Sequence, residues 1–341
     1  MRTLSLALLT VLSLVTFTSA QSGSAAGPYK VLKTAKVGGD GGFDYVFADA
    51  AARKLYVPRN GADGRVTVFN LDTLQPAGEI TKTNARGAAV DSGHGFSSSR
   101  PIAMWDSNTL APIKTIEVQG APDGIFADPF NHRIWVFSHS APNATVIDAK
   151  DGSIVGTLDL DGAPEQAASD GRGHLYVDLE DKNQVAVIDA AALRVTGRYD
   201  ISSAAKTPAG LALDAEHHVL FVACRNPQMM VMVNAETGAI LASLPIGAGV
   251  DGAVFNPATQ EAFSSQSDGT LTVIKENSPT SFVVAQTVQT QAGAKTLTLD
   301  SKTQQVYLIA ADYTSTPPPT PGGRGGRAMV PNSFAVLVVG K

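Results

Sequence analysis

A segment of about forty residues recurs along the chain, and this repeat limits the protein to few architectures. Aligned apolar positions of the repeat are Phe69, Trp105, Ile147, Ile188, Val233, Ile274 and Leu337. Their successive spacings are 36, 42, 41, 45, 41 and 63 residues. A period near forty is the length of one four-stranded blade of a β-propeller. A solenoid of the same period would need exposed end caps, whereas a closed ring would not.

Each repeat is composed of short strands separated by tight turns. The first half is clear in DGIFADPFNHRIWV, from Asp123, and the second half in ATVIDAKDGSIVGTL, from Ala144. The apolar runs hold four to six residues and are rich in Val, Ile, Phe and Tyr, as is typical of strands. Asp, Asn, Gly and Thr fill the turns between them. Beyond the N-terminal segment, no long stretch has helical periodicity, so we expect an all-β protein.

The two ends of the chain complement each other. The seventh repeat ends with SFAVLVVGK and lacks a fourth strand, while a spare strand, YKVLKTAKV, precedes the first repeat at residues 29–37. If the spare strand completes the last sheet, the ring is closed and leaves no open edge. We therefore predict a seven-bladed β-propeller of four-stranded blades over residues 29–341, closed by its N-terminal strand.

Several strand segments resemble a known family. LYVPRN, LYVDLE, LFVACR and VYLIAA are each followed by a V-x-V-type strand and a turn with Thr or Gly. In this respect residues 29–341 resemble the YVTN-repeat β-propellers of the YncE type. The resemblance implies a propeller fold and an exported protein, and nucleic-acid binding is known for some relatives.

The N-terminus indicates export. Arg2 is followed by an apolar stretch from Leu4 to Phe17 and by small residues up to Ala20. This pattern is typical of a signal peptide at residues 1–20, with a linker at 21–28, and the apolar stretch is shorter than the ~20 residues of a membrane anchor. We therefore expect a periplasmic or secreted protein without stable membrane insertion once the signal is cleaved.

The net charge and the cysteine content indicate which partners and which cysteine chemistry to expect. Without the signal, 25 basic and 31 acidic residues leave a net charge of −6, which argues against a nucleic-acid partner. Cys224 is the only cysteine, so no intramolecular disulfide can form, and its place in VLFVACR predicts a buried, inert thiol.

An acid precedes several first strands at a fixed distance. In a propeller the first strand of each blade is innermost, so equivalent residues should meet around the axis. Counting back five residues from the acid or amide that ends each first strand gives a ring with six ionisable members. The ring comprises Asp44, Arg86, Asp123, Glu165, Ala209, Asp251 and Lys295.

Loops between the second and third strands should open on the same face as this ring. They add Arg59, His139, Glu180 and Arg225 to the candidate site. Two interpretations stay open. The ring is either a solvated rim whose acids pair with Arg86 and Lys295, or a polar funnel that binds a small ligand, a cation or a partner's side chain. Neighbouring like charges would raise the pKa of its acids.

The last blade contains an unusual loop. Residues 313–333 carry TSTPPPTPGGRGGRAMVPN, in which consecutive prolines favour extended geometry and the glycines add flexibility. Arg324 and Arg327 make the loop basic. A lid over the acidic ring, a strap for a partner and a disordered insertion are all consistent with the sequence.

No motif indicates catalysis or a cofactor. His94, His132, His174, His217 and His218 fall in turns expected on the opposite face from His139, so we expect no histidine cluster that holds zinc or copper. Calcium at the acids of the ring is a weaker alternative. We expect a monomeric, non-catalytic scaffold that binds an unknown small ligand or protein. The alternative is an enzyme on the same scaffold, either a lactonase-like hydrolase or a quinoprotein-dehydrogenase-like protein.

Overall fold

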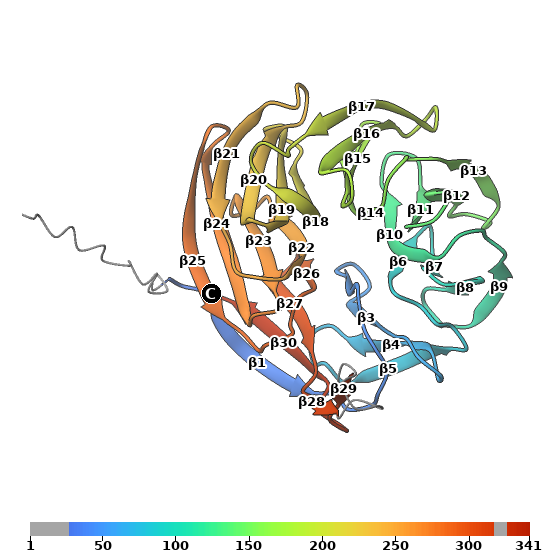
Figure 1. Ribbon diagram of the computed structural model, residues 1–341. Coiled ribbons are helices and arrows are strands. Elements are labelled where there is room, and N and C mark those ends of the chain that lie inside the picture. Colours follow the sequence, from blue (N-terminus) through green and yellow to red (C-terminus); the bar gives the residue numbers. More distant parts are fainter. Residues whose placement is uncertain (1–26, 317–325) are drawn as a thin grey trace, which may run out of the picture.

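Seven antiparallel sheets of four strands each form a ring in the computed structural model, which describes residues 27–316 and 326–341 (Figure 1). Blades 1 and 2 consist of β2 (Phe47–Asp49), β3 (Lys54–Arg59), β4 (Arg65–Asn70), β5 (Pro76–Thr81), β6 (Ala88–Asp91), β7 (His94–Ser97), β8 (Ile102–Asp106) and β9 (Pro112–Ile116). Blades 3 and 4 consist of β10 (Pro122–Asp128), β11 (Arg133–Ser138), β12 (Ala144–Asp148), β13 (Ile154–Leu158), β14 (Pro164–Ser169), β15 (His174–Leu179), β16 (Gln184–Asp189) and β17 (Arg194–Asp200).

Blades 5 to 7 complete the ring. Blades 5 and 6 consist of β18 (Lys206–Asp214), β19 (Val219–Asn226), β20 (Gln228–Asn234), β21 (Ile240–Pro245), β22 (Val250–Asn256), β23 (Glu261–Gln266), β24 (Thr270–Ser278) and β25 (Ser281–Gln289). Blade 7 consists of β26 (Leu297–Asp300), β27 (Gln305–Ala310), β30 (Ala335–Gly340) and β1 (Lys30–Lys36). The prediction of seven four-stranded blades from the forty-residue repeat is confirmed.

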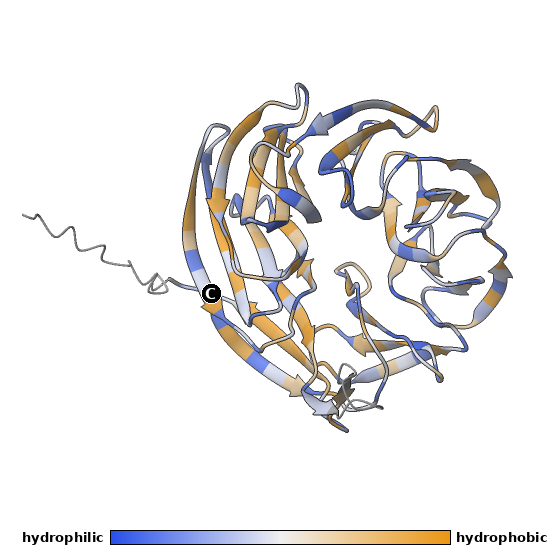
Figure 2. Ribbon diagram, in the orientation of Figure 1, coloured by the Kyte–Doolittle hydropathy of each residue, from blue (hydrophilic) through white to orange (hydrophobic). Residues whose placement is uncertain are grey.

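The hydrophobic core is divided into layers between neighbouring blades. One layer joins blades 3 and 4 through Trp135, Phe137, Leu175 and Ile188, and another joins blades 4 and 5. Apolar segments follow the strands, while the turns are polar (Figure 2). Because each sheet buries both of its faces against its neighbours, a single blade could not keep its apolar residues from water.

The turns between third and fourth strands repeat one local design. The last residue of the third strand is Asn or Asp in five blades, and its side-chain oxygen accepts backbone N–H groups of the turn. Four residues later the backbone enters the left-handed region. Glycine adopts this conformation without steric cost at Gly152 and Gly238, whereas Leu74, Leu110 and Leu193 adopt it at an energetic cost because of their β-carbons. These turns fix the register of the outer strands.

Strand β1 lies at the outer edge of blade 7. It pairs antiparallel with β30, with Lys30 opposite Gly340 and Lys36 opposite Ala335. Just before it, the Tyr29 hydroxyl donates a hydrogen bond to Glu261 of blade 6, and the Gln286 side chain bonds both Tyr29 N and Tyr29 O, at 3.0 and 2.7 Å. The N-terminal segment thus contacts blades 6 and 7. That it holds the ring together stays a prediction.

The predicted signal peptide, most of the linker and Arg324 lie outside the described residues. The described ends of the Pro/Gly-rich loop pair as a hairpin of β28 (Tyr313–Thr316) and β29 (Gly326–Met329). Within residues 27–316 and 326–341, no helix is long and apolar enough to cross a membrane.

Candidate functional site

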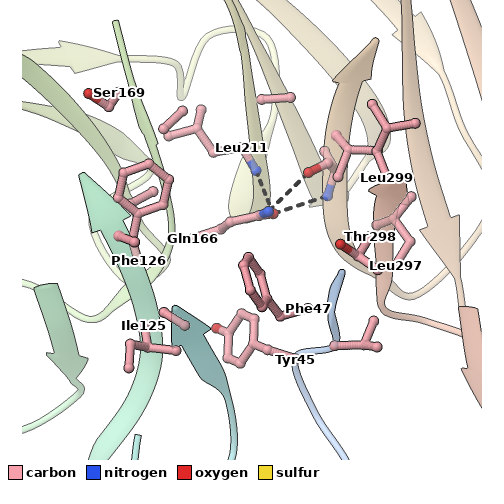
Figure 3. Close-up of a pocket in the computed structure, with 18 of the residues that line it drawn as sticks. Tyr45, Phe47, Ile125, Phe126, Gln166, Ser169, Leu211, Leu297, Thr298 and Leu299 are labelled. Atoms are coloured by element: carbon pink, nitrogen blue, oxygen red, sulfur yellow. Dashed lines mark hydrogen bonds between the residues drawn. The ribbon is translucent and has the colours of Figure 1, made fainter. Parts of the chain in front are cut away.

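A cavity of about 410 Å³ lies at the centre of the ring and is lined by the innermost strand of every blade (Figure 3). Most side chains of its wall are apolar, but polar atoms make up nearly half of the surface that the wall exposes. The wall includes Phe47, Ala89, Ile125, Phe126, Ala168, Leu211, Leu213, Phe255, Leu297 and Leu299. Tyr45, Glu165, Gln166 and Ser169 add polar groups. An apolar cavity with a few polar groups is the usual form of a small-molecule site.

One position in each blade determines how closely the inner strands can approach one another around the central axis. It directly follows the ring position found in the sequence and is glycine in four blades, at Gly87, Gly124, Gly210 and Gly252. A β-carbon at Gly210 would lie 2.8 Å from the backbone carbon of Gly252, and one at Gly124 would lie 2.6 Å from the Glu165 carbonyl oxygen. Glycine therefore allows neighbouring inner strands to approach closely.

Gln166, at the same position in blade 4, joins the inner strands of three blades. Its Oε1 atom accepts the N–H groups of Leu211 and Ala253, both at 3.0 Å, and its Nε2 atom donates to the Ala253 carbonyl oxygen at 2.9 Å. Figure 3 shows its side chain reaching across the cavity. Its own N–H group donates to the buried Asp178 carboxylate at 2.6 Å. The side-chain amide of Gln166 thus links the inner strands of blades 4, 5 and 6 on one side of the central axis.

Tyr45 occupies this position in blade 1. Its hydroxyl lies 3.1 Å from the Glu165 carbonyl oxygen and 3.2 Å from Glu165 Oε2. Its side chain lies against Gly87 and Gly124, because an added β-carbon would lie 3.3 Å from Tyr45 Cβ at Gly87 and 3.5 Å from the Tyr45 hydroxyl oxygen at Gly124. Tyr45 therefore spans the axis from blade 1 to blade 4, between the charged residues and the apolar part of the cavity.

Nine charged or ionisable side chains form a network at the Tyr45 end of the cavity, which we call the acid–base ring. Its members are Asp44, Arg86, Asp123, His139, Glu165, Glu180, Arg225, Asp251 and Lys295. Six of them lie at or just before the start of a first strand, His139 and Glu180 lie just after second strands, and Arg225 lies near the end of β19.

Acids and bases alternate around this network. Arg86 Nη1 lies 3.2 Å from Asp44 and 3.4 Å from Asp123, and His139 Nε2 lies 3.4 Å from Asp123 and 3.5 Å from Glu165. Because each base stands between two acids, each acid of this arc has a nearby basic partner.

The other arc continues the alternation. Arg225 donates to Glu180 at 2.5 Å and also to Asp251. Lys295 bonds Asp251 and lies 3.6 Å from Asp44. The network closes between the Glu165 and Glu180 carboxyl groups, whose interaction raises the pKa of Glu165.

The bases of the ring are more exposed than its acids. Side-chain exposure is 31–51% for Arg86, His139, Arg225 and Lys295, but 11–16% for Asp44, Asp123, Glu165 and Asp251. The acids therefore lie behind the bases. A molecule that arrives from solvent meets N–H donors first.

Glu165 has the most perturbed acidity of the ring. Burial, the interaction with the Glu180 carboxylate as hydrogen-bond acceptor and the nearby charges of Asp178, Glu180 and Asp123 raise the pKa of Glu165 to about 9. Burial also raises the pKa of Asp44, Asp123 and the Tyr45 hydroxyl, and raises that of Asp178 to about 7. At neutral pH Glu165 is therefore protonated and can donate to Glu180, while the remaining charges of the ring nearly balance.

The raised pKa of Glu165 predicts a loss of stability at alkaline pH. The unfolded chain releases this proton near its ordinary pKa of 4.5, whereas the folded chain keeps it up to about pH 9. The folded state then binds more protons, so stability falls as pH rises from about 4.5 to 9, by no more than about 1.4 kcal/mol per pH unit from this group. The Glu165→Gln variant keeps an N–H donor for Glu180 but cannot ionise.

Urea unfolding of both proteins between pH 5 and 9.5 tests this. We expect the free energy of unfolding of Glu165→Gln to rise relative to that of the native protein as pH increases, because the Asp178 contribution is common to both. Parallel curves would show that Glu165 titrates normally.

The structure places one candidate residue outside the network. Arg59 is buried, donates to the Asp40 and Gly38 carbonyl oxygens at 2.9 and 3.0 Å, and stacks 3.5 Å above the Phe334 ring. Burial lowers the pKa of Arg59 to about 10. Arg59 thus joins the entry to blade 1 with blade 7. Ala209 has no charge, and Arg225 of the same blade extends between Glu180 and Asp251 in its place.

Among the described residues, two groups of side chains are close enough to hold a metal ion, and each combines two acids with a single histidine. They are Asp123, His139 and Glu165 in the acid–base ring, and Asp214, His217 and Glu276 between blades 5 and 6. In the first group, Arg86 lies beside Asp123, and Tyr45 and Glu180 contact Glu165, so we assign no metal there.

Sequence reasoning missed Tyr45, Gln166 and Asp178. The first two have a visible signal, because they replace glycine at a position that is glycine in four of the seven repeats. Asp178 has none, since it lies within a second strand and is recognised only by its bond to Gln166 N.

Comparisons with known proteins agree with the fold. No protein-family model matches the chain. The uncharacterized protein YncE of Salmonella typhi is 23% identical over 196 residues, covering 52% of this chain and 53% of that protein, and YncE of Salmonella typhimurium gives the same values. The chain thus spans about half the length of the curated relatives it matches.

Solved structures give a broader match. The WD40 repeats of RRP9 align with a TM-score of 0.73 at 11% identity, covering 93% of this chain and 99% of that chain. A chain of the mitotic checkpoint complex aligns with a TM-score of 0.70 at 13% identity, covering 87% of this chain and 95% of that chain. A functionally unknown protein of Desulfotomaculum acetoxidans aligns with a TM-score of 0.63 at 13% identity, covering 80% of this chain and 95% of that chain. At such identities the likeness shows the fold alone.

Proposed function

We propose that this chain, a YncE-like β-propeller, is an exported, monomeric scaffold that binds a small ligand at the acid–base ring without catalysis. The ligand carries an anionic group, such as a carboxylate or phosphate, and an apolar body. The anionic group contacts the bases of the ring, and the body extends toward the apolar wall of the cavity.

The proposal rests on the basic side chains of the ring, which are exposed to solvent and have more N–H donors than their ion pairs use. An arriving cation would find every acid of the ring beside a base. An arriving anion would find the Arg86 guanidinium, which has five N–H groups and donates one hydrogen bond, to Asp44. Of the two interpretations open at the sequence level, the pairing of acids with Arg86 and Lys295 is present, and it leaves the ring suited to an anion.

One observation would be consistent with the alternative, catalysis at the same ring. Glu165, protonated at neutral pH, lies 3.5 Å from His139 and near Asp123, and such groups can exchange protons with a substrate. Among the described residues, the only cysteine is buried and burial raises its pKa, so it is no candidate nucleophile. We therefore favour binding.

Calorimetric titration with 4-bromobenzoate tests the binding site, because this probe combines a carboxylate with an apolar ring. We expect saturable binding at one site that the Arg86→Gln variant weakens about tenfold, since a charge-assisted hydrogen bond contributes about 1.5 kcal/mol or more. Asp44 keeps Lys295 and Asp123 keeps His139 in this variant, so the fold should persist.

The matched control is Arg172→Gln. Arg172 is 56% exposed, close to the 51% of Arg86, but lies in the turn after β14, at the other end of the inner strand. Its replacement should leave the affinity unchanged. Equal loss in both variants, or equally tight binding of the cationic analogue 4-bromobenzylamine, would contradict the proposal.

A further inference from the structure

Two acids and a histidine meet between blades 5 and 6, away from the acid–base ring. Asp214 ends β18, His217 follows in the turn to β19, and Glu276 lies in β24 of the next blade. His217 Nδ1 lies 2.7 Å from Asp214 Oδ2 and 3.2 Å from Glu276 Oε1. One ligand atom from each residue lies within 4.8 Å of the others.

Glu276 is the unexplained member of this group. Its side chain is 1% exposed, and neither carboxylate oxygen accepts a hydrogen bond of good geometry. Leaving a buried carboxylate without donors is costly, and burial raises the pKa of Glu276 to about 7. The side chain is nevertheless aimed at the Asp214 and His217 pair, and its nearest basic atom is His217 Nδ1, 3.2 Å from Oε1, which forms no hydrogen bond with it.

Another blade junction shows how the protein usually satisfies such an acid. Asp300, at the same position in blade 7, receives two hydrogen bonds from Arg53 of blade 1, both at 2.8 Å. Asp214 instead faces a second acid across its junction. Its Oδ1 atom accepts the N–H groups of Glu216 and His217 in the turn, which leaves Oδ2 free to point at His217 and Glu276.

We propose that Asp214 Oδ2, His217 Nδ1 and Glu276 Oε1 bind a divalent transition-metal ion, best fitted by Zn²⁺. Zinc takes imidazole nitrogen and carboxylate oxygen at about 2.0–2.2 Å, which places tetrahedral ligand atoms about 3.4 Å apart. The separations from His217 Nδ1 are shorter than this, 2.7 Å to Asp214 and 3.2 Å to Glu276, so side-chain rotations that move the ligand atoms apart would make room for the ion. His217 is 27% exposed and provides the entry path and room for a water as fourth ligand.

The ion would link blade 5 to blade 6 as Arg53 links blade 1 to blade 7. Calcium prefers six to eight oxygen ligands, so a group of two carboxylates and one imidazole discriminates against it. This inference is independent of ligand binding at the acid–base ring, because the two groups share no residue.

Calorimetric titration of the chelator-treated full chain with Zn²⁺ and with Ca²⁺ tests the site. We expect one equivalent of Zn²⁺ to bind at least 100-fold more tightly than Ca²⁺ and to raise the Tm. The Glu276→Gln variant keeps the size of the side chain but removes its charge, and it should weaken Zn²⁺ binding at least tenfold and abolish the rise in Tm. X-ray absorption at the zinc edge should show only nitrogen and oxygen ligands, with one imidazole.

His174→Gln is the matched control, because His174 Nδ1 lies 2.9 Å from Asp170 in a similar turn but belongs to no group of three ligands among the described residues. It should bind Zn²⁺ like the native chain. If Glu276→Gln does not fold, His217→Gln gives the same test. Absence of saturable Zn²⁺ binding, or binding that survives in these variants, would overturn the proposal.

Discussion

A chain that begins at Val37, without β1 and Tyr29, will lose about 5 kcal/mol or more of unfolding free energy, which is comparable with the whole stability of many domains. The deletion removes the ladder from Lys30 to Lys36 and the bonds of Tyr29 to Glu261 and Gln286. It also exposes β30, all of whose residues are buried, as an unpaired edge that invites aggregation.

The control is a chain that begins at Gly27, which retains β1 and Tyr29. Denaturant unfolding should give the same midpoint for this chain as for the full chain, while the chain from Val37 should unfold at a much lower denaturant concentration or aggregate. Equal midpoints for both truncated chains would show that the N-terminal strand does not hold the ring closed.

Gly210→Ala will destabilise the protein by about 3 kcal/mol. The added β-carbon would lie 2.8 Å from Gly252 C and 2.9 Å from Ala253 N, distances that only a backbone shift can relieve. Such a shift would strain the bonds that Gln166 makes to Leu211 N and Ala253 N. Overpacking at a rigid site typically costs about 1–3 kcal/mol of unfolding free energy. We expect the upper end of this range because both atoms that the new β-carbon would approach belong to the backbone.

Gly197→Ala is the matched control, because Gly197 also lies within a strand but a β-carbon there would approach Val187 no closer than 3.8 Å. Its unfolding free energy should be equal to or slightly above the native value, since alanine restricts the unfolded chain. A Gly210→Ala variant as stable as Gly197→Ala would mean that the inner strands of blades 5 and 6 are not closely packed.

The blade number and most of the acid–base ring could be predicted because both follow from the repeat. The acid or amide at the end of each first strand marks the register, so counting back five residues finds equivalent positions in every blade. Residues at equivalent positions meet around the axis, which is why Asp44, Asp123 and Asp251 come together although the sequence separates them widely.

What the repeat does not encode is contact between non-equivalent positions. Arg59 was assigned to the ring from its loop, but Phe334 of blade 7, distant in sequence, provides the surface on which it stacks. Glu276 lies in a third strand and reaches His217 of the preceding blade, so the second metal-ligand group had no sequence signal. The alternation of acids and bases likewise depends on side-chain reach, because His139 and Glu180 extend from loops after second strands and Arg225 from the end of β19.

A crystal structure of the protein with 4-bromobenzoate is the most direct test of the ligand site, because the anomalous signal of bromine locates the probe. We expect one bromine peak within the central cavity, with the carboxylate within hydrogen-bond distance of Arg86, Lys295 or Arg225. A bromine peak only on the outer surface, or a carboxylate turned away from these bases, would contradict the account.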